Sequence, residues 1–190
     1  MTNEIISGTN DLAFGMKFIN PAAIVDLLEV KVGMSVGDFG AGTGYFTFPL
    51  AEKVGQNGLV WAIDILKEKI ETIESQAKLL RLGNITTRRA NLELVHGSKL
   101  EENSLDWVFL VTMLFQNKDK KPIILEAARV LKKGGKILVI EWNVGDYSFG
   151  PARELRVSKE KVFELAQEAD LSVAKEIEIS DFHYGLILEK

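Results

Sequence analysis

The feature that most constrains this chain is a glycine-rich turn within residues 34–46, placed between a short apolar run and a helical pattern. Gly40, Gly42 and Gly44 alternate with small residues, and Asp38 precedes them. Glycine adopts positive φ without strain and leaves no Cβ in front of a ligand. The turn leads into a helix N-terminus, whose free N–H groups and dipole attract carboxylates and phosphates. The segment predicts a loop that binds a nucleotide-type cofactor; the alternative is a plain strand-to-helix turn.

Two common glycine patterns do not fit this loop. A dinucleotide fingerprint requires G-x-G-x-x-G, and a third glycine counted from Gly40 would fall at Tyr45. A P-loop requires a lysine after its glycines, and none follows here. The remaining pattern, D-x-G-x-G-x-G from Asp38 to Gly44, resembles the first motif of class I methyltransferases that use S-adenosylmethionine.

A second acid supports a ligand that contains adenosine. The strand-like run 59–63 ends at Asp64, twenty residues after Gly44. An acid at the carboxyl end of the second strand of a doubly wound sheet binds ribose hydroxyls. Because NAD enzymes use the same arrangement, Asp64 predicts the class of ligand and leaves its identity open.

Strand-like and helical segments alternate along the chain, which favours an α/β fold. Asn20 and Ser158 are expected to cap the first and last helices. The resemblance covers about residues 20–190 and implies a Rossmann-like, doubly wound, mostly parallel seven-stranded sheet that ends in an antiparallel hairpin. We expect a single domain over residues 1–190. The expected helices after the first are 45–54, 67–82, 122–133 and one that follows Ser158, and the closing strands are 171–179 and 184–189.

Two helix ends carry strong local signals. Gly83 and Asn84 are expected to stop the helix 67–82. Lys132 and Lys133, followed by two glycines, are expected to complement the dipole at the end of the helix 122–133. The run from Glu126 to Ile137 resembles the corresponding junction of the branch that includes ubiquinone and menaquinone biosynthesis methyltransferases. We interpret that run as structural, so it indicates the branch and not the substrate.

The resemblance also implies cofactor contacts after the third strand. Asn91 would accept a hydrogen bond from the adenine amino group, and the N–H of Leu92 would meet a ring nitrogen. The alternative for Asn91 is a turn in which its side chain bonds its own backbone. The full set of expected cofactor-binding residues is Asp38, Gly40, Ala41, Gly42, Gly44, Asp64, Ile65, Asn91, Leu92, Val111 and Thr112.

No residue is assigned as a catalytic base. His96 and His183 are expected to be structural or solvated, while Glu141 and Trp142 follow a strand and are expected to face the pocket. The chain lacks the Pro-Pro-Tyr motif of nucleobase amine methyltransferases, and Leu114-Phe115-Gln116 stands where many relatives have Leu-His-His. Residues 1–20 and the loop 143–153 could each cover the active site or be ordinary loops.

Composition excludes several functions. Lys and Arg number 23 against 27 Asp and Glu, a net charge of −4, so no nucleic-acid partner is expected. The absence of cysteine excludes disulfides, thiolate nucleophiles and cysteine metal sites, and with them thiolate-dependent arsenite methylation. No metal is expected. The polar N-terminus and the short apolar runs predict a cytoplasmic protein without a transmembrane segment, and the oligomeric state is left open.

The favoured hypothesis is methyl transfer from S-adenosylmethionine, by in-line displacement, to a small apolar or aromatic acceptor. The main alternative is a non-catalytic protein that keeps the methyltransferase fold and either binds the cofactor or serves as a partner subunit. Protein carboxyl methylation, tRNA base methylation and an NAD-dependent oxidoreductase are further alternatives, and the charge balance argues against tRNA.

Overall fold

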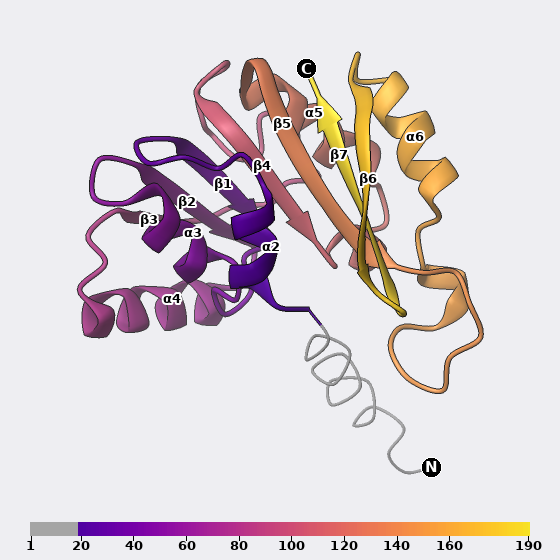
Figure 1. The fold of residues 1–190 in the computed structure, drawn as a ribbon, viewed down its shortest axis with the longest axis horizontal. Coiled ribbons are helices and arrows are strands. Elements are labelled where there is room, and N and C mark those ends of the chain that lie inside the picture. The colour runs from indigo at the N-terminus through magenta and orange to yellow at the C-terminus, as the bar shows by residue number, and fades with distance from the viewer. Residues whose placement is uncertain (1–18) are drawn as a thin grey trace.

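The computed structural model describes residues 19–190, which are built around one seven-stranded sheet (Figure 1). The strand order is β3-β2-β1-β4-β5-β7-β6. The expected cover formed by the N-terminal segment lies outside the described residues, apart from Ile19 and Asn20. The strands are β1 (Ser35–Phe39), β2 (Leu59–Asp64), β3 (Ile85–Arg89), β4 (Leu105–Val111), β5 (Leu131–Trp142), β6 (Ser172–Ser180) and β7 (His183–Glu189).

The direction of the strands confirms the expected fold class. β3, β2, β1, β4 and β5 pair in parallel, whereas β7 runs antiparallel to both β5 and β6. The chain moves outward from β1 through β2 and β3, and then returns to the other side of β1 as β4. Such a reversal opens a crevice at the carboxyl ends of the two strands concerned, which is where doubly wound sheets bind ligands.

Helices cover both faces of the sheet. Along β4, Trp107 and Phe109 pack in one core with α2 and α3, while Val108 and Leu110 pack in another core with α5 and α6. This alternation is the two-residue period of a strand that is buried on both faces. The helices are α2 (Pro21–Leu27), α3 (Thr47–Val54), α4 (Lys67–Leu80), α5 (Lys121–Val130) and α6 (Lys159–Gln167), with short 3₁₀ turns η1 (Leu114–Gln116) and η2 (Arg153–Leu155).

Turns rather than a helix connect β3 to β4. His96, Lys99 and Asn103 in this connection adopt positive φ of 54°, 55° and 53°, which is uncommon for residues other than glycine. A buried polar network holds the connection to α5: the carboxylate of Glu126 accepts from both the N–H and the hydroxyl of Ser98. The network gives the run that begins at Glu126 a structural role.

Arg129 completes this network. Its guanidinium donates two hydrogen bonds of 2.8 Å to the Glu126 carboxylate and a third to the carbonyl of Leu100. Such two-pronged Arg–carboxylate pairs combine charge with fixed geometry. The pair therefore fixes the connection between β3 and β4 to α5 through Ser98 and Leu100.

Local signals located some helix ends correctly and misplaced others. Asn20 and Ser158 accept from the backbone N–H of Ala23 and Lys161, as expected of N-caps. The expected stop at Gly83 and Asn84 is wrong, because α4 ends at Leu80 and Arg81 takes the left-handed conformation, with φ of 57°. Asn84 instead donates to two carbonyls at the end of α3.

The expected lysine cap of α5 is also wrong. The helix ends at Val130, where Leu131 turns to an extended conformation and pairs with Leu105 of β4. Lys132 therefore lies in β5, and its ammonium group pairs with Asp106 at 2.8 Å. Strand pairing outweighed the local helix signal at this position.

We expect Glu126→Ala to lower the free energy of unfolding by about 3 kcal/mol or more, because it leaves the buried Ser98 N–H without its acceptor and the Arg129 guanidinium without its carboxylate partner. Urea denaturation measures this change. The matched control is Glu71→Ala on α4, which removes an exposed carboxylate paired with Lys67 and should cost less than about 0.5 kcal/mol. Equal losses in the two variants would contradict a structural role for the network.

Candidate cofactor site

A cleft of about 350 Å³ lies at the carboxyl ends of the parallel strands, where the strand order reverses. Four segments form it: the glycine loop after β1, the turn between β2 and α4, the residues after β3, and the residues after β4. Segments far apart in the sequence therefore meet at one place. The lining residues are Gly40, Gly42, Asp64, Ile65, Leu66, Lys69, Ala90, Asn91, Leu92, Met113, Gln116 and Asn117.

The glycine loop presents bare backbone to this cleft at Gly42. Gly40, Gly42 and Gly44 have φ of 74°, 54° and 90°. A Cβ at Gly42 would meet no atom within 4 Å, whereas at Gly40 it would approach Met113 and at Gly44 the ring of Phe48. Gly42 is thus the glycine of this loop that leaves open space on the cleft side.

Asp64 ties the two turns of the cleft together. One carboxylate oxygen accepts from the N–H of Gly42 and the other from the N–H of Leu66, both at 2.9 Å. Each carboxylate oxygen can accept more than one hydrogen bond. Asp64 therefore organises the loop and keeps acceptor capacity at the wall of the cleft.

Asp38 lies behind the cleft and not in its wall. Its carboxylate is 3% exposed and accepts from the hydroxyl of Thr47, the first residue of α3, at 2.5 Å. Burial raises the pKa of Asp38 to about 6, with a further contribution from the negative charge of Asp64. The residue holds the start of α3 against β1.

Asn91 and Leu92 line the cleft, at the edge expected for an adenine ring. The side-chain oxygen of Asn91 accepts from the N–H of Glu93 at 2.9 Å. This contact is the turn that the sequence left open as an alternative. One acceptor position of this oxygen is therefore occupied, and its contact with an adenine amino group stays a prediction.

After β4 the chain turns sharply. As a result the two residues predicted here, Val111 and Thr112, do not line the cleft. Thr112 is buried, with φ of 47°, a strained value for a β-branched residue. Its N–H donates to the carbonyl of Ile140 at 2.7 Å. The turn places Met113, Gln116 and Asn117 in the wall instead.

Six of the eleven predicted residues lie in the wall of the cleft, and five do not. The five are Asp38, Ala41, Gly44, Val111 and Thr112, and direct binding by them stays a prediction. The sequence analysis missed Leu66, Lys69, Ala90, Met113, Gln116 and Asn117. Adjacency to Asp64 and Asn91 could have found the first three. No sequence signal places the last three, because they depend on the turn at Thr112.

The candidate acid–base residues do not reach the cleft. His183 is 1% exposed, and burial, together with the charge of Arg156, lowers its pKa to about 4. His96 is exposed on the connection between β3 and β4. Glu141 and Trp142, expected to face the pocket, are fully buried. Among the residues lining the cleft, only Asp64 and Lys69 carry charge.

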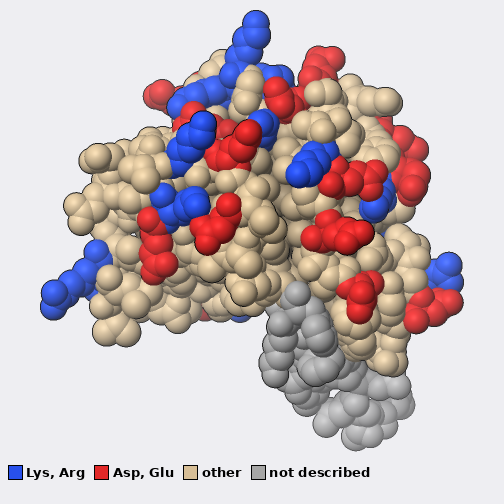
Figure 2. Space-filling view, viewed as in Figure 1, with Lys and Arg blue, Asp and Glu red and all other residues tan. Residues whose placement is uncertain are grey.

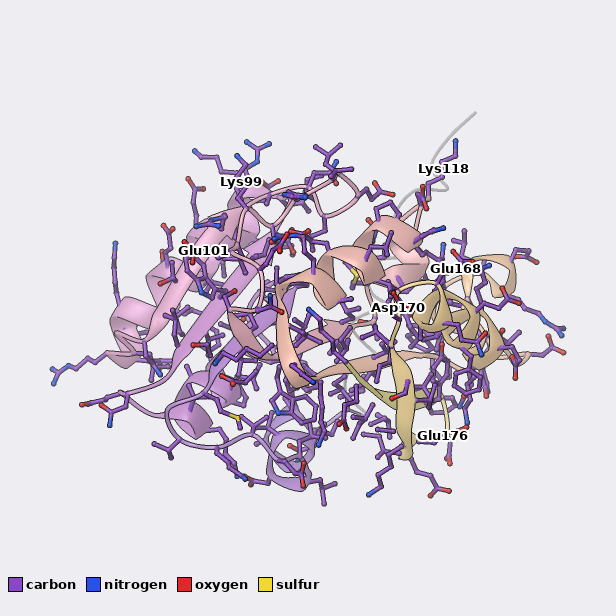
Figure 3. All side chains as sticks on the ribbon, turned by 90° about the horizontal axis from the view of Figure 1, so that it is seen from above. Lys99, Glu101, Lys118, Glu168, Asp170 and Glu176 are labelled. Carbon is purple, nitrogen blue, oxygen red and sulfur yellow. The ribbon has the colours of Figure 1, made fainter. Side chains whose placement is uncertain are left out.

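A second, more open groove adjoins the cleft and shares Gln116 and Asn117 with it. Its volume is about 900 Å³. The connection between β4 and α5 forms one wall, and η2 with α6 forms the other; Figure 3 labels Lys118 on the first wall and Glu168 on the second. The pair Lys121–Glu168, at 2.7 Å, joins the two walls. Apolar lining comes from Phe115, Val144, Leu155, Val157 and Leu165.

The loop 143–153 is held down and contributes no residue to the wall of the cleft. The guanidinium of Arg156 donates to four loop carbonyls at 2.7–3.3 Å. Tyr147 and Phe149 pack on Phe182 in the turn between β6 and β7, with ring centroids 5.2 and 4.7 Å apart. Tyr147 and Phe149 thus belong to an aromatic cluster that joins this loop to the turn between β6 and β7.

The surface and the remaining charged groups add few features. Figure 2 shows Lys and Arg interspersed with Asp and Glu on the face in view. Within residues 19–190, no group of His, Asp or Glu side chains could hold a metal ion. In the same part of the chain, no helix has the length and apolar character to cross a membrane. The cytoplasmic location stays a prediction.

A protein-family model described as a methyltransferase domain matches residues 30–184. The chain is 34% identical over 118 residues to a demethylmenaquinone methyltransferase of Oceanobacillus iheyensis, covering 60% of this chain and 47% of the relative. It is 32% identical over 136 residues to a ubiquinone/menaquinone biosynthesis C-methyltransferase of Haemophilus ducreyi, covering 70% and 51%. The chain thus spans about half the length of these curated relatives.

The fold also matches a solved structure. The crystal structure of a SAM-dependent methyltransferase from Aquifex aeolicus has a TM-score of 0.84 over 95% of this chain and 94% of that chain. The sequence identity is 23%, so this likeness concerns the fold alone.

We expect Asp38→Asn to change how stability depends on pH. The folded pKa of about 6 lies above the ordinary value of 3.8, so this carboxyl stabilises the fold below pH 4 and loses that contribution as pH rises through 6. At about 1.4 kcal/mol per pKa unit, the parent should lose about 3 kcal/mol of unfolding free energy between pH 4 and pH 7. The variant has no carboxyl at this position and should not show this loss. Urea denaturation of both proteins across this range measures the difference. If the free energies of unfolding of the two proteins depend on pH in the same way, the raised pKa of Asp38 is contradicted.

Proposed function

The chain belongs to the methyltransferase domain family, and from this premise we propose that it transfers a methyl group from S-adenosylmethionine to a small apolar or aromatic acceptor. Family membership implies S-adenosylmethionine as the methyl donor. The observation that carries the proposal is the cleft at the strand reversal, where bare backbone at Gly42 faces open space beside the Asp64 carboxylate. We also propose that residues 1–190 form one domain.

The residues present fit the cofactor. Asp64 has acceptor capacity for ribose hydroxyls, the bare backbone at Gly42 leaves room for the methionine portion, and we place the adenine against Asn91 and Leu92. Ligand sites commonly have volumes of about 300–1,000 Å³, and the cleft lies within this range. When bound, the sulfonium supplies an electrophilic methyl group.

The protein's part in the reaction is alignment and exclusion of water. Holding two reactants in line can contribute up to about 7–11 kcal/mol. No histidine lines the cleft, and Asp64, its one carboxylate, is already bonded to two backbone N–H groups. The wall of the cleft therefore supplies no free base, and a proton lost by the acceptor would pass to a carboxylate of the adjoining groove or to water.

We place the acceptor in the groove that shares Gln116 and Asn117 with the cleft. Its apolar lining includes the buried Phe115 and the half-exposed Leu155. Two of the relatives are named for menaquinone or ubiquinone methylation, which supports a quinone-type ring as the acceptor. An aromatic ring would gain free energy by burial against these side chains.

We expect the parent to bind S-adenosylhomocysteine more tightly than NAD in calorimetry. Gly42→Ala should lose most of the affinity for S-adenosylhomocysteine, because its Cβ would occupy part of the cleft. Gly134→Ala is the matched control: Gly134 also has positive φ and open space around its Cβ position, but lies in β5 outside the cleft. Both variants should lose similar thermal stability. Equal cofactor affinity in the two variants would remove the glycine loop from the site.

We expect methyl transfer from labelled S-adenosylmethionine to a short-chain demethylmenaquinol, with the label recovered in the quinol ring. Leu155→Glu should raise the KM for that quinol at least tenfold and leave the affinity for S-adenosylhomocysteine unchanged, because Leu155 lines the groove and not the cleft. A parent that binds the cofactor but methylates none of a panel of quinols and phenols would support the non-catalytic alternative.

A further inference from the structure

The short 3₁₀ turn η1 forms part of the wall between the cofactor cleft and the adjoining groove. Gln116 and the following Asn117 line both spaces. Met113, just before the turn, lines the cleft, and Phe115 within it lines the groove. The position of η1 therefore affects the shape of both spaces.

Backbone pairing alone does not hold this turn to the sheet. The β4–β5 ladder ends at the pair of Val111 with Ile140, followed by the bond from the Thr112 N–H to the Ile140 carbonyl. Thr112 then takes its strained positive φ, and the chain leaves the sheet. Residues in such conformations persist where the surroundings hold them.

The Glu141 side chain continues the connection where the ladder stops. Glu141 lies one residue beyond Ile140 in β5, and its backbone pairs with Tyr184 of β7. Its carboxyl oxygen Oε1 accepts from the N–H of Leu114, the first residue of η1, at 2.6 Å. A side chain from the neighbouring strand thus takes the place of a ladder bond.

Burying the Glu141 side chain at this position costs free energy. It is 0% exposed, and its second oxygen, Oε2, has no hydrogen-bond partner within the described part of the chain. Burial raises the pKa of Glu141 to about 8, although the N–H groups around it and the charge of Lys120 act in the opposite direction. An apolar side chain would avoid this cost, so packing alone does not account for a carboxyl group.

We propose that Glu141 is a positioning residue for methyl transfer, which sets the wall between the cofactor cleft and the groove by holding the Leu114 N–H. The inference rests on the proposed function, because it assigns one of the two spaces to S-adenosylmethionine. Glu141 touches neither space itself and acts through η1.

The test compares Glu141→Gln with Glu141→Met. Gln keeps an oxygen that can accept from the Leu114 N–H, whereas Met has similar length and no such acceptor. Calorimetry with S-adenosylhomocysteine should show Glu141→Gln within about twofold of the parent dissociation constant and Glu141→Met weakened at least tenfold. Hydrogen exchange should show faster exchange over residues 112–117 in Glu141→Met only.

Each outcome decides between distinct explanations. A parent that fails to bind S-adenosylhomocysteine overturns the proposed function. A parent that binds it, with Glu141→Met binding equally well and exchanging equally slowly at residues 112–117, overturns the role of Glu141. If Glu141→Met does not fold, Glu141→Asp replaces it, because its carboxyl is one methylene too short to reach Leu114. We expect Glu141→Asp to show the same weakened binding, and parent-like binding by a folded Glu141→Asp would overturn the inference.

Discussion

The parallel pairing of β1 with β2 on one side and β4 on the other is the constraint on which the rest of the structure depends. Because β2 and β3 extend in one direction and β4 and β5 in the other, the loops after these strands diverge and leave a crevice. The glycine loop can serve a ligand only because it ends at this point. The same loop at the edge of the sheet would face solvent on one side.

Acidic side chains hold several of the loops at which the regular hydrogen bonding of the sheet ends. Asp64 accepts from two turns of the cleft, Glu126 holds the connection between β3 and β4, and Glu141 holds η1. Asp38 does the same for the start of α3 through a hydroxyl. A carboxyl group suits this task because its two oxygens offer several acceptor positions to N–H groups outside the ladder of the sheet.

Burial divides these acids by function. Asp64 is partly exposed and lies at the wall of the cleft, so it can bind a ligand as well as the loop. Asp38, Glu126 and Glu141 are buried and can act only on the protein around them. The charges in the wall therefore come from Asp64 and Lys69, which fits a site whose main task is to align two reactants.

The sequence by itself determined the α/β class, the glycine loop, the acid that ends β2 and the caps at Asn20 and Ser158. These features depend on backbone conformation and on spacing within one segment, which local residues decide. The resemblance to a methyltransferase family added the strand count and the closing hairpin, and the structure confirms both.

Only the tertiary structure decided which residues form the wall of the cleft. Met113 and Gln116 reach it because Thr112 turns left-handed beside Ile140, a partner that lies 28 residues further along the chain. The end of α5 at Val130 likewise depends on the pairing of Leu131 with Leu105. Contacts between distant segments outweigh local preferences at such points. The spacing of residues within one segment cannot predict these contacts.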